Sequence, residues 1–331
     1  MHNFSHIYIE KSILEHSNTL NILKKYPNAK IVILKDYKNF FNPSNQNFQV
    51  QKSSPKLILA QKKDNFLYTG SYLTGNNGYK QFYYNSLILN CVYNCSYCYL
   101  QGMYNSANIV IFVNEEDFFR ETSLLLEKDS LYLCISYDTD LLAFESLMPY
   151  ASKWIEFSRN KKDLLIEIRT KSSSYKLISH LKPSDGIILA WTVSPEKVIK
   201  EYEIGTPTLN RRLDSISAAI NDGWKVRLCI EPILCIKDWK LHYAELINKI
   251  FNRVNGENIF DCHIGTFRIN SDYLKKIKKI RSDSDILYFP FKSKEKVSSY
   301  PENIRNEMKE YIKNNLSKNI ALDKIYYIEE K

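Results

Sequence analysis

The sequence lacks the features of an exported or membrane protein. No run of about 18 apolar residues occurs in the 331-residue chain, so no membrane-spanning helix is expected. Residues 1–6 have no basic segment followed by an apolar one, so no signal peptide is expected. Without an export route, the seven cysteines are expected to be thiols or ligands rather than disulfides, and the protein is expected in the cytoplasm.

Internal repeats and low-complexity linkers are also missing. The hydrophobic content of 44% and the charged content of 25% are ordinary for a globular enzyme, and a chain of this length can bury a large core. We therefore expect one large α/β domain or one domain with appendages. The net charge of +9 favours an anionic partner such as nucleic acid, although an AT-rich genome that encodes much Lys and Asn explains it equally well.

Three of the seven cysteines lie within eight residues, with the spacing C-x3-C-x2-C: Cys91, Cys95 and Cys98. Three thiolates can hold three irons of a [4Fe–4S] cluster and leave the fourth iron open to a substrate or cosubstrate. This spacing, followed by Tyr99, is the radical S-adenosylmethionine (SAM) signature. A zinc knuckle and a partial disulfide framework are the alternatives. Zinc normally requires a fourth Cys or His nearby, and the six histidines all lie far away in sequence.

Strands and helices alternate after the cysteine loop. Such alternation implies parallel strands joined by right-handed crossovers. The strand before the cysteines, at 87–89, brings the number of strands to six, which fits the partial (β/α)6 TIM-like barrel of radical SAM enzymes. The other expected strands are 131–136, 164–171, 187–194, 225–232 and 259–267, and the expected helices are 115–127, 144–160, 174–180, 209–222 and 242–251.

The barrel, expected at 86–270, is flanked by two smaller parts. Residues 1–85 indicate an α/β lead-in, with strands at 7–9, 29–34 and 57–60, a helix at 14–26 and a turn at 73–78. Residues 271–331 are basic and end in an amphipathic helix, 301–316, and a strand, 324–328. Lysines interleaved with Phe289 and Phe291 suit a phosphate backbone and unstacked bases, although most basic runs are solvated helix faces.

Alternate residues of the expected barrel strands are polar. Side chains alternate between the two faces of a strand, and one face of a barrel strand meets the lumen. The polar faces are therefore expected to line a cavity, whereas antiparallel strands with one solvated face are the alternative. Functional residues are expected at the carboxyl ends of the strands: Cys134, Ser136, Lys171, Thr192, Ser194 and Glu231.

These motifs together resemble the spore photoproduct lyase family over nearly the whole chain. The cysteine loop ending at Gln101 resembles the family's cluster loop. The segments that narrow the resemblance to this family are Cys134-Ile135-Ser136, Thr170-Lys171, Val198-Ile199-Lys200 and Glu203-Ile204-Gly205-Thr206, the last with Ile204 where the family has Pro.

The resemblance implies a radical SAM lyase that repairs the spore photoproduct, 5-thyminyl-5,6-dihydrothymine, in DNA to two thymines through a 5′-deoxyadenosyl radical. The implied cofactors are a [4Fe–4S] cluster and SAM. Cys134 is implied as hydrogen-atom donor, with Tyr97 and Tyr99 as relay residues, although aromatic packing explains both tyrosines equally well. The implied SAM contacts are Ser136, Lys171, Thr192 and Ser194.

The implied partners are double-stranded DNA carrying the lesion and a low-potential electron donor of the flavodoxin or ferredoxin class. The implied location is the bacterial cytoplasm, including the spore core. The family's lesion-contacting hairpin contains glycines, but residues 288–296 have none, so a tight glycine turn is not expected here. Lys292 and Lys294 are the candidate DNA contacts in this segment.

Two other functions stay open at this point. The chain could be a radical SAM enzyme of the same family that acts on a different substrate, or a non-catalytic iron–sulfur or zinc protein that binds nucleic acid. The sequence gives no role to three further cysteines, Cys229, Cys235 and Cys262.

Overall fold

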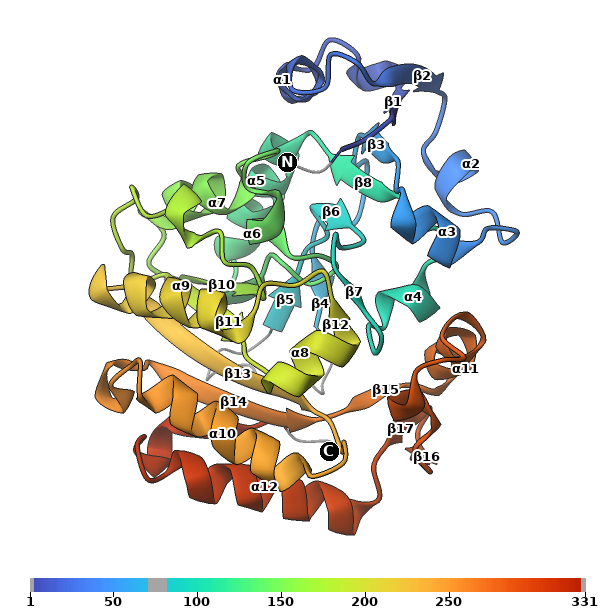
Figure 1. Ribbon diagram of the computed structural model, residues 1–331. Coiled ribbons are helices and arrows are strands. Elements are labelled where there is room, and N and C mark those ends of the chain that lie inside the picture. Colours follow the sequence, from blue (N-terminus) through green and yellow to red (C-terminus); the bar gives the residue numbers. More distant parts are fainter. Residues whose placement is uncertain (1–2, 71–81, 329–331) are drawn as a thin grey trace.

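The computed structural model describes residues 3–70 and 82–328, which form two main sheets (Figure 1). Their buried side chains form one large hydrophobic core and two small separate clusters. The turn expected at 73–78 lies outside the described residues. The first sheet has the order β2-β1-β3-β8-β6, and only β6 is antiparallel to its neighbour. Its strands are β1 (His6–Glu10), β2 (Lys30–Leu34), β3 (Leu57–Ala60), β6 (Ile88–Leu89) and β8 (Ile109–Phe112).

The first sheet contains the expected lead-in and two strands from beyond it. All four residues of β3 are buried, because this central parallel strand is covered on both faces. The sheet extends beyond the lead-in boundary expected at residue 85. Its strands β6 and β8 precede and follow the cysteine loop in the chain, and they pair with each other. The lead-in therefore packs directly against the segment that carries the cysteines.

The second sheet is the expected barrel sheet. From β5 to β18 every pair of neighbours is parallel, and only the edge strand β4 is antiparallel. Figure 1 shows the curl of this sheet. Its strands are, in spatial order, β4 (Tyr68–Thr69), β5 (Phe82–Tyr84), β9 (Leu131–Cys134), β10 (Leu164–Thr170), β11 (Ile187–Thr192), β13 (Lys225–Ile233), β14 (Asp261–Thr266) and β18 (Ile325–Tyr327).

The parallel barrel architecture is confirmed, but its first strand differs from the expected one. The segment 87–89 forms β6, which pairs with β8 in the first sheet rather than with β9. The barrel begins instead with β5, whose Tyr84 pairs with Cys134 of β9. The aromatic segment Phe82-Tyr83-Tyr84 was not expected to be a strand, because three residues are too few for a periodic pattern.

Helices cover the outer face of the barrel sheet. In α9, the apolar side chains of Leu209, Leu213 and Ile216 are buried at helical spacing, and Gly223 just after the helix has a positive φ of 90°, which favours glycine. The helices are α1 (Ser17–Lys24), α2 (Lys38–Phe41), α3 (Phe48–Ser53), α4 (Leu100–Met103), α5 (Glu115–Leu126), α6 (Leu141–Phe144), α7 (Tyr150–Ser158), α8 (Glu196–Tyr202), α9 (Leu209–Asn221), α10 (Trp239–Phe251), α11 (Ser271–Ile280) and α12 (Glu302–Leu316).

Several helical segments differ from the expectation. The helix expected at 144–160 is shorter: it begins at Tyr150 as α7, because Pro149 precedes it and proline fits the first turn of a helix but not its interior, and the separate short helix α6 ends at Phe144. The helix expected at 174–180 is a single 3₁₀ turn, Tyr175–Leu177. The helices α2, α3, α4, α8 and α11 were not expected at all. Within the described ranges, no helix is both long and apolar enough to cross a bilayer.

The carboxyl-terminal part contains a tight hairpin, contrary to the expectation from its lack of glycine. Glu295 and Lys296 both adopt left-handed backbone conformations, with φ of 48° and 65°, between two antiparallel strands. Each such residue costs about 1–2 kcal/mol. The Ser271 N–H donates to the Lys296 carbonyl at 2.8 Å and so helps to hold the turn. The strands of this small sheet are β15 (Arg268–Asn270), β16 (Lys292–Lys294) and β17 (Val297–Ser299).

Candidate active site

A cavity of about 750 Å³ lies at the carboxyl ends of the barrel strands, between them and the cysteine loop. Tyr273 of α11 and the turn residues Glu295 and Lys296 also line it. Most of the expected site residues lie on its wall: Cys91, Cys95, Cys98, Tyr97, Tyr99, Cys134, Ser136, Lys171 and Thr192. The chain thus gathers residues that are more than 100 positions apart around one space.

The cysteine loop is fixed by backbone hydrogen bonds at both ends. Its two-residue strand β7 (Asn94–Cys95) pairs antiparallel with β12 (Glu203–Ile204). The Ser96 N–H donates to the Tyr202 carbonyl at 2.7 Å, and the Cys98 N–H donates to the Cys95 carbonyl at 3.1 Å. All seven cysteines are free, so the alternative of a partial disulfide framework is wrong.

Three cations surround the three loop thiols. Lys52, from α3 in the lead-in, donates a hydrogen bond to the Cys91 carbonyl. Lys171 lies at the end of β10, close enough to Cys95 for their charges to interact. Arg281, which follows α11, donates to the Gln101 side chain at 2.8 Å and is likewise close to the thiols.

The charge of this donor set fits a [4Fe–4S] cluster. Burial raises the pKa of Cys91 to about 11, so the thiolate form needs positive charge nearby. The three cations supply it, and metal binding itself deprotonates thiols. Among the described residues, no three His, Cys, Asp or Glu side chains converge on one point as the ligands of a single ion do. The three thiols line the same cavity, where each could bind a different iron of a cluster.

Glu203 is the buried anion behind the cysteine loop. Its carboxylate accepts hydrogen bonds from the Tyr97 hydroxyl, from Arg212 Nη2 at 2.5 Å and from Ser194 Oγ at 2.9 Å. Burial alone would raise the pKa of Glu203, but Arg212 and Lys171 lower it to about 2. In the sequence, Glu203 stands out only as part of a family-like segment, and no local pattern indicates this role.

Lys171 is held by Asp140, a residue that the sequence did not single out. One Asp140 oxygen accepts from the backbone N–H of Lys171 at 2.6 Å, and the other accepts from the Thr170 hydroxyl at 2.7 Å. Burial opposes the charge on Lys171, but Glu203 and Cys95 raise its pKa above the ordinary value. Lys171 is therefore a cation, with its backbone held in place, on the wall that also carries the cysteines.

Cys134 stands at the end of β9 and is 5% exposed. Its Sγ lies 3.9 Å from Ser136 Oγ, and the Ser136 hydroxyl accepts from the Arg169 N–H at 2.7 Å. Burial and the nearby Glu167 carboxylate raise the pKa of Cys134 to about 12. The side chain is thus a neutral thiol with an intact S–H bond at neutral pH.

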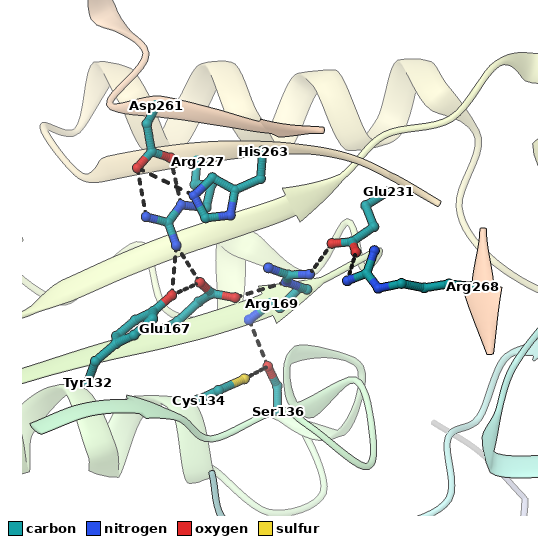
Figure 2. Close-up of polar contacts among 10 residues, drawn as sticks. All are labelled: Tyr132, Cys134, Ser136, Glu167, Arg169, Arg227, Glu231, Asp261, His263 and Arg268. Atoms are coloured by element: carbon teal, nitrogen blue, oxygen red, sulfur yellow. Dashed lines mark hydrogen bonds and ion pairs between the residues drawn. The ribbon is translucent and has the colours of Figure 1, made fainter. Parts of the chain in front are cut away.

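The polar strand faces form an ion-pair network in the lumen, as expected, and the alternative of solvated antiparallel strands is wrong. Figure 2 shows Glu167 between two guanidinium groups, with Arg227 Nη1 at 2.5 Å and Arg169 Nε at 2.8 Å. Arg227 also donates to both oxygens of Asp261 at 2.6 and 2.7 Å. Arg169 extends the network to Glu231 at 3.0 Å. Although burial opposes it, the two arginines hold the pKa of Glu167 well below its usual range.

Three expected site residues lie away from the cavity. Ser194 is buried and bonds to Glu203 rather than facing the space. Lys292 and Lys294 are exposed on β16, whereas the cavity rim of this hairpin consists of the next residues, Glu295 and Lys296. No local sequence pattern could predict that this turn lies at the cavity rim, because the position of the turn depends on how the small sheet of β15 to β17 packs against the rest of the protein.

Comparison with known proteins points to one family. The family model described as spore photoproduct lyase matches residues 4–328. The spore photoproduct lyase of Clostridium acetobutylicum is 23% identical over 198 residues, which are 59% of this chain and 59% of that protein. The enzyme of a Geobacillus strain is 24% identical over 202 residues, which are 59% of this chain and 58% of that protein. The aligned part of the chain thus spans just under 60% of the length of these two curated relatives.

Solved structures share the fold. A cysteine-to-alanine mutant of spore photoproduct lyase superposes with a TM-score of 0.84 at 17% identity and covers 99% of this chain and 98% of its own. A double mutant with bound AdoMet and dinucleoside spore photoproduct superposes with a TM-score of 0.81 at 16% identity and covers 99% of each chain. The partial-barrel fold class is therefore confirmed over essentially the whole chain.

Proposed function

The chain belongs to the spore photoproduct lyase family, and from this premise we propose that it is a radical SAM lyase that repairs the spore photoproduct in DNA to two thymines. The observation that carries the proposal is the placement of four thiols around one cavity. Three come from the cysteine loop, where cations surround them. The fourth, Cys134, comes from a barrel strand and remains a neutral thiol.

Cys91, Cys95 and Cys98 would hold three irons of a [4Fe–4S] cluster. When bound, the cluster and SAM supply a 5′-deoxyadenosyl radical, which abstracts a hydrogen atom from the lesion. The cation of Lys171, whose backbone N–H is bonded to Asp140, is suited to pair with the SAM carboxylate. The hydroxyls of Ser136 and Thr192 face the same cavity and are suited to its amino group or ribose. Ser194 would support this wall indirectly, through Glu203.

Cys134 would return a hydrogen atom to the product radical after the bond between the thymines breaks. The S–H bond is weak enough for this transfer, and burial keeps the hydrogen on sulfur. Ser136 lies beside the sulfur and is fixed by the Arg169 backbone, so the thiol faces the cavity from a rigid strand. The ion-pair network fills the lumen below Cys134, and its charged groups are already paired with one another. The substrate would therefore enter from the mouth of the cavity.

The proposed partners follow from this reaction. Double-stranded DNA that carries the lesion would lie across the cavity mouth, and Lys292 and Lys294 on the exposed strand β16 could contact its phosphates. A flavodoxin or ferredoxin would supply the electron. A lesion of spore DNA would be met in the bacterial cytoplasm, including the spore core.

The test is repair of a dinucleotide spore photoproduct by the anaerobically reconstituted protein, with thymidine-containing product followed by chromatography. Conversion of the two joined thymines to two unmodified thymines, still attached to their sugars, is the expected result. Formation of 5′-deoxyadenosine without any repair would instead indicate a relative that acts on a different substrate. Absence of 5′-deoxyadenosine despite an intact cluster would contradict every enzymatic function of this site.

A further inference from the structure

Two cations from outside the barrel bind the cysteine loop. Lys52 belongs to α3 in the lead-in, and its ammonium group donates a hydrogen bond to the Cys91 carbonyl. Arg281 follows α11, beyond the barrel, and is 8% exposed. Gln101 of α4 accepts from Gln49 of α3 at 3.4 Å and from Arg281 at 2.8 Å, so α4 lies between the two segments (Figure 1).

Arg281 is held against the loop by three oxygen atoms. Its Nε donates to the Gln101 side chain, and its Nη2 donates to the Asn94 side chain and to the Asn94 carbonyl at 3.4 Å. The Gln101 amide donates in turn to the Cys95 carbonyl at 2.7 Å. The guanidinium group is thus connected to two neighbouring residues of the loop, one of them a candidate cluster ligand.

Neither cation has a carboxylate partner within the described part of the chain. The hydrogen bonds of Lys52 and Arg281 there all go to neutral oxygen atoms. Asp283, two residues after Arg281, is exposed, so water screens its charge. The two cations are also close enough to repel each other. Because buried charges in proteins are normally paired or lie beside a metal, their counter-charge must come from another group.

The loop thiols are that group. The charge of Lys52 interacts with all three of them, and the charge of Arg281 interacts with Cys95 and Cys98. The cavity is lined by Lys171 but by neither of these two cations, as far as the described residues show. Lys171 is therefore placed to meet SAM, whereas Lys52 and Arg281 act on the loop from behind.

We propose that Lys52 and Arg281 raise the reduction potential of the [4Fe–4S] cluster held by the cysteine loop. This inference rests on the proposed function, which requires that cluster. One electron from the low-potential donor adds one negative charge beside the two cations, and no bond forms or breaks. Net charge and hydrogen bonding set the potentials of iron–sulfur clusters, and a dry interior keeps the attraction between opposite charges strong.

The proposal gives the two parts that flank the barrel a shared role. Lys52 comes from the lead-in and Arg281 from the carboxyl-terminal segment. Both parts would supply the positive charge that favours the reduced state, while the barrel supplies the cavity.

The test is a redox titration of the reconstituted protein without SAM and without lesion, in which electron paramagnetic resonance follows the reduced cluster. Arg281→Gln and Lys52→Gln remove each charge and keep a side-chain hydrogen-bond donor. Arg281→Lys and Lys52→Arg keep the charge. Lys279→Gln is the matched control, because Lys279 is exposed on α11, two residues before Arg281. Iron and sulfide content shows that each sample holds a full cluster.

A lower reduction potential in both Gln variants is the expected result, with values close to that of the unaltered protein in the charge-keeping variants and in Lys279→Gln. Unaltered potentials in the Gln variants would overturn the proposal. Equal shifts in the Gln and charge-keeping variants would also overturn it, because they would reflect a displaced loop rather than a lost charge. Failure of both Gln variants to take up a cluster would overturn it too, because the cations would then serve assembly of the site.

This measurement does not depend on lesion repair. A potential that follows the two charges, together with failed repair, would refute the proposed function alone. Normal repair by a protein whose potential ignores both charges would refute this inference alone.

Discussion

The Tyr97 hydroxyl donates a hydrogen bond to the buried carboxylate of Glu203 and so joins the cysteine loop to the strand β12 behind it. Arg212 neutralises the same carboxylate from α9, and both side chains of this ion pair are 0% exposed. The loop that would hold the cluster is therefore fixed by a charge pair that water does not reach, and not only by its own backbone.

Replacing this carboxylate is expected to destabilise the protein. Glu203→Gln leaves the Arg212 guanidinium buried without a counter-charge, and removing one partner of a buried pair typically costs about 3–5 kcal/mol. The measurement is urea unfolding of the cluster-free protein. The control is Glu201→Gln, two residues earlier and exposed, which is expected to change little. Equal unfolding midpoints for the two variants would refute the role given to Glu203.

Acid is expected to destabilise the fold through the same group. The pKa of Glu203 is lowered to about 2 in the folded state, whereas an unfolded glutamate titrates near ~4.3. The stabilising contribution is thus present above the unfolded value and is lost as the pH falls from ~4.3 toward the folded value. Unfolding free energies measured between neutral pH and pH ~3 should fall less steeply in Glu203→Gln than in the unaltered protein. Parallel curves would contradict this assignment.

Lys171 is expected to determine SAM affinity. Lys171→Met removes the cation proposed to pair with the SAM carboxylate, and a hydrogen bond to a charged group contributes about 1.5–3 kcal/mol, or roughly 10- to 100-fold in affinity. Equilibrium dialysis of SAM against the reconstituted protein measures this loss. Lys176→Met, an exposed lysine five residues later, is the matched control. Unaltered affinity in Lys171→Met would place the SAM carboxylate elsewhere.

The cluster ligands can be tested without turnover. Cys91→Ala is expected to lose most of the iron bound after anaerobic reconstitution, because only two of the three thiolates remain. Cys235→Ala is the control, since this thiol does not line the cavity. Iron and sulfide content, with the visible absorption spectrum, gives the result. Full iron content in Cys91→Ala would show that the cluster ligands are other residues.

The sequence predicted which residues face the site better than it predicted which residues hold them in place. Alternation of polar and apolar residues placed Cys134, Ser136 and Glu167 on the lumen face, because strand periodicity is a local property. The residues that hold these groups come from far away in the chain. Lys52 reaches the cysteine loop from the lead-in, and Arg281 reaches it from beyond the barrel. Such contacts depend on docking between elements, which no local pattern encodes.

The carboxyl-terminal hairpin shows the same limit. Lack of glycine argued against a tight turn, but Glu295 and Lys296 adopt it because the flanking strands and the Ser271 hydrogen bond hold them. Tertiary contacts thus overrode a local preference of about 1–2 kcal/mol per residue.

The central claim is that the cavity uses Cys134 to return a hydrogen atom to the repaired thymines, and one isotope measurement tests it most directly. The reconstituted protein, equilibrated in D₂O so that the thiol carries deuterium, is given dinucleotide spore photoproduct for a single turnover. Mass spectrometry of the product should find one deuterium per repaired lesion in the unaltered protein, and no normal repair in Cys134→Ala. Repaired product without deuterium, or normal repair by Cys134→Ala, would contradict the account.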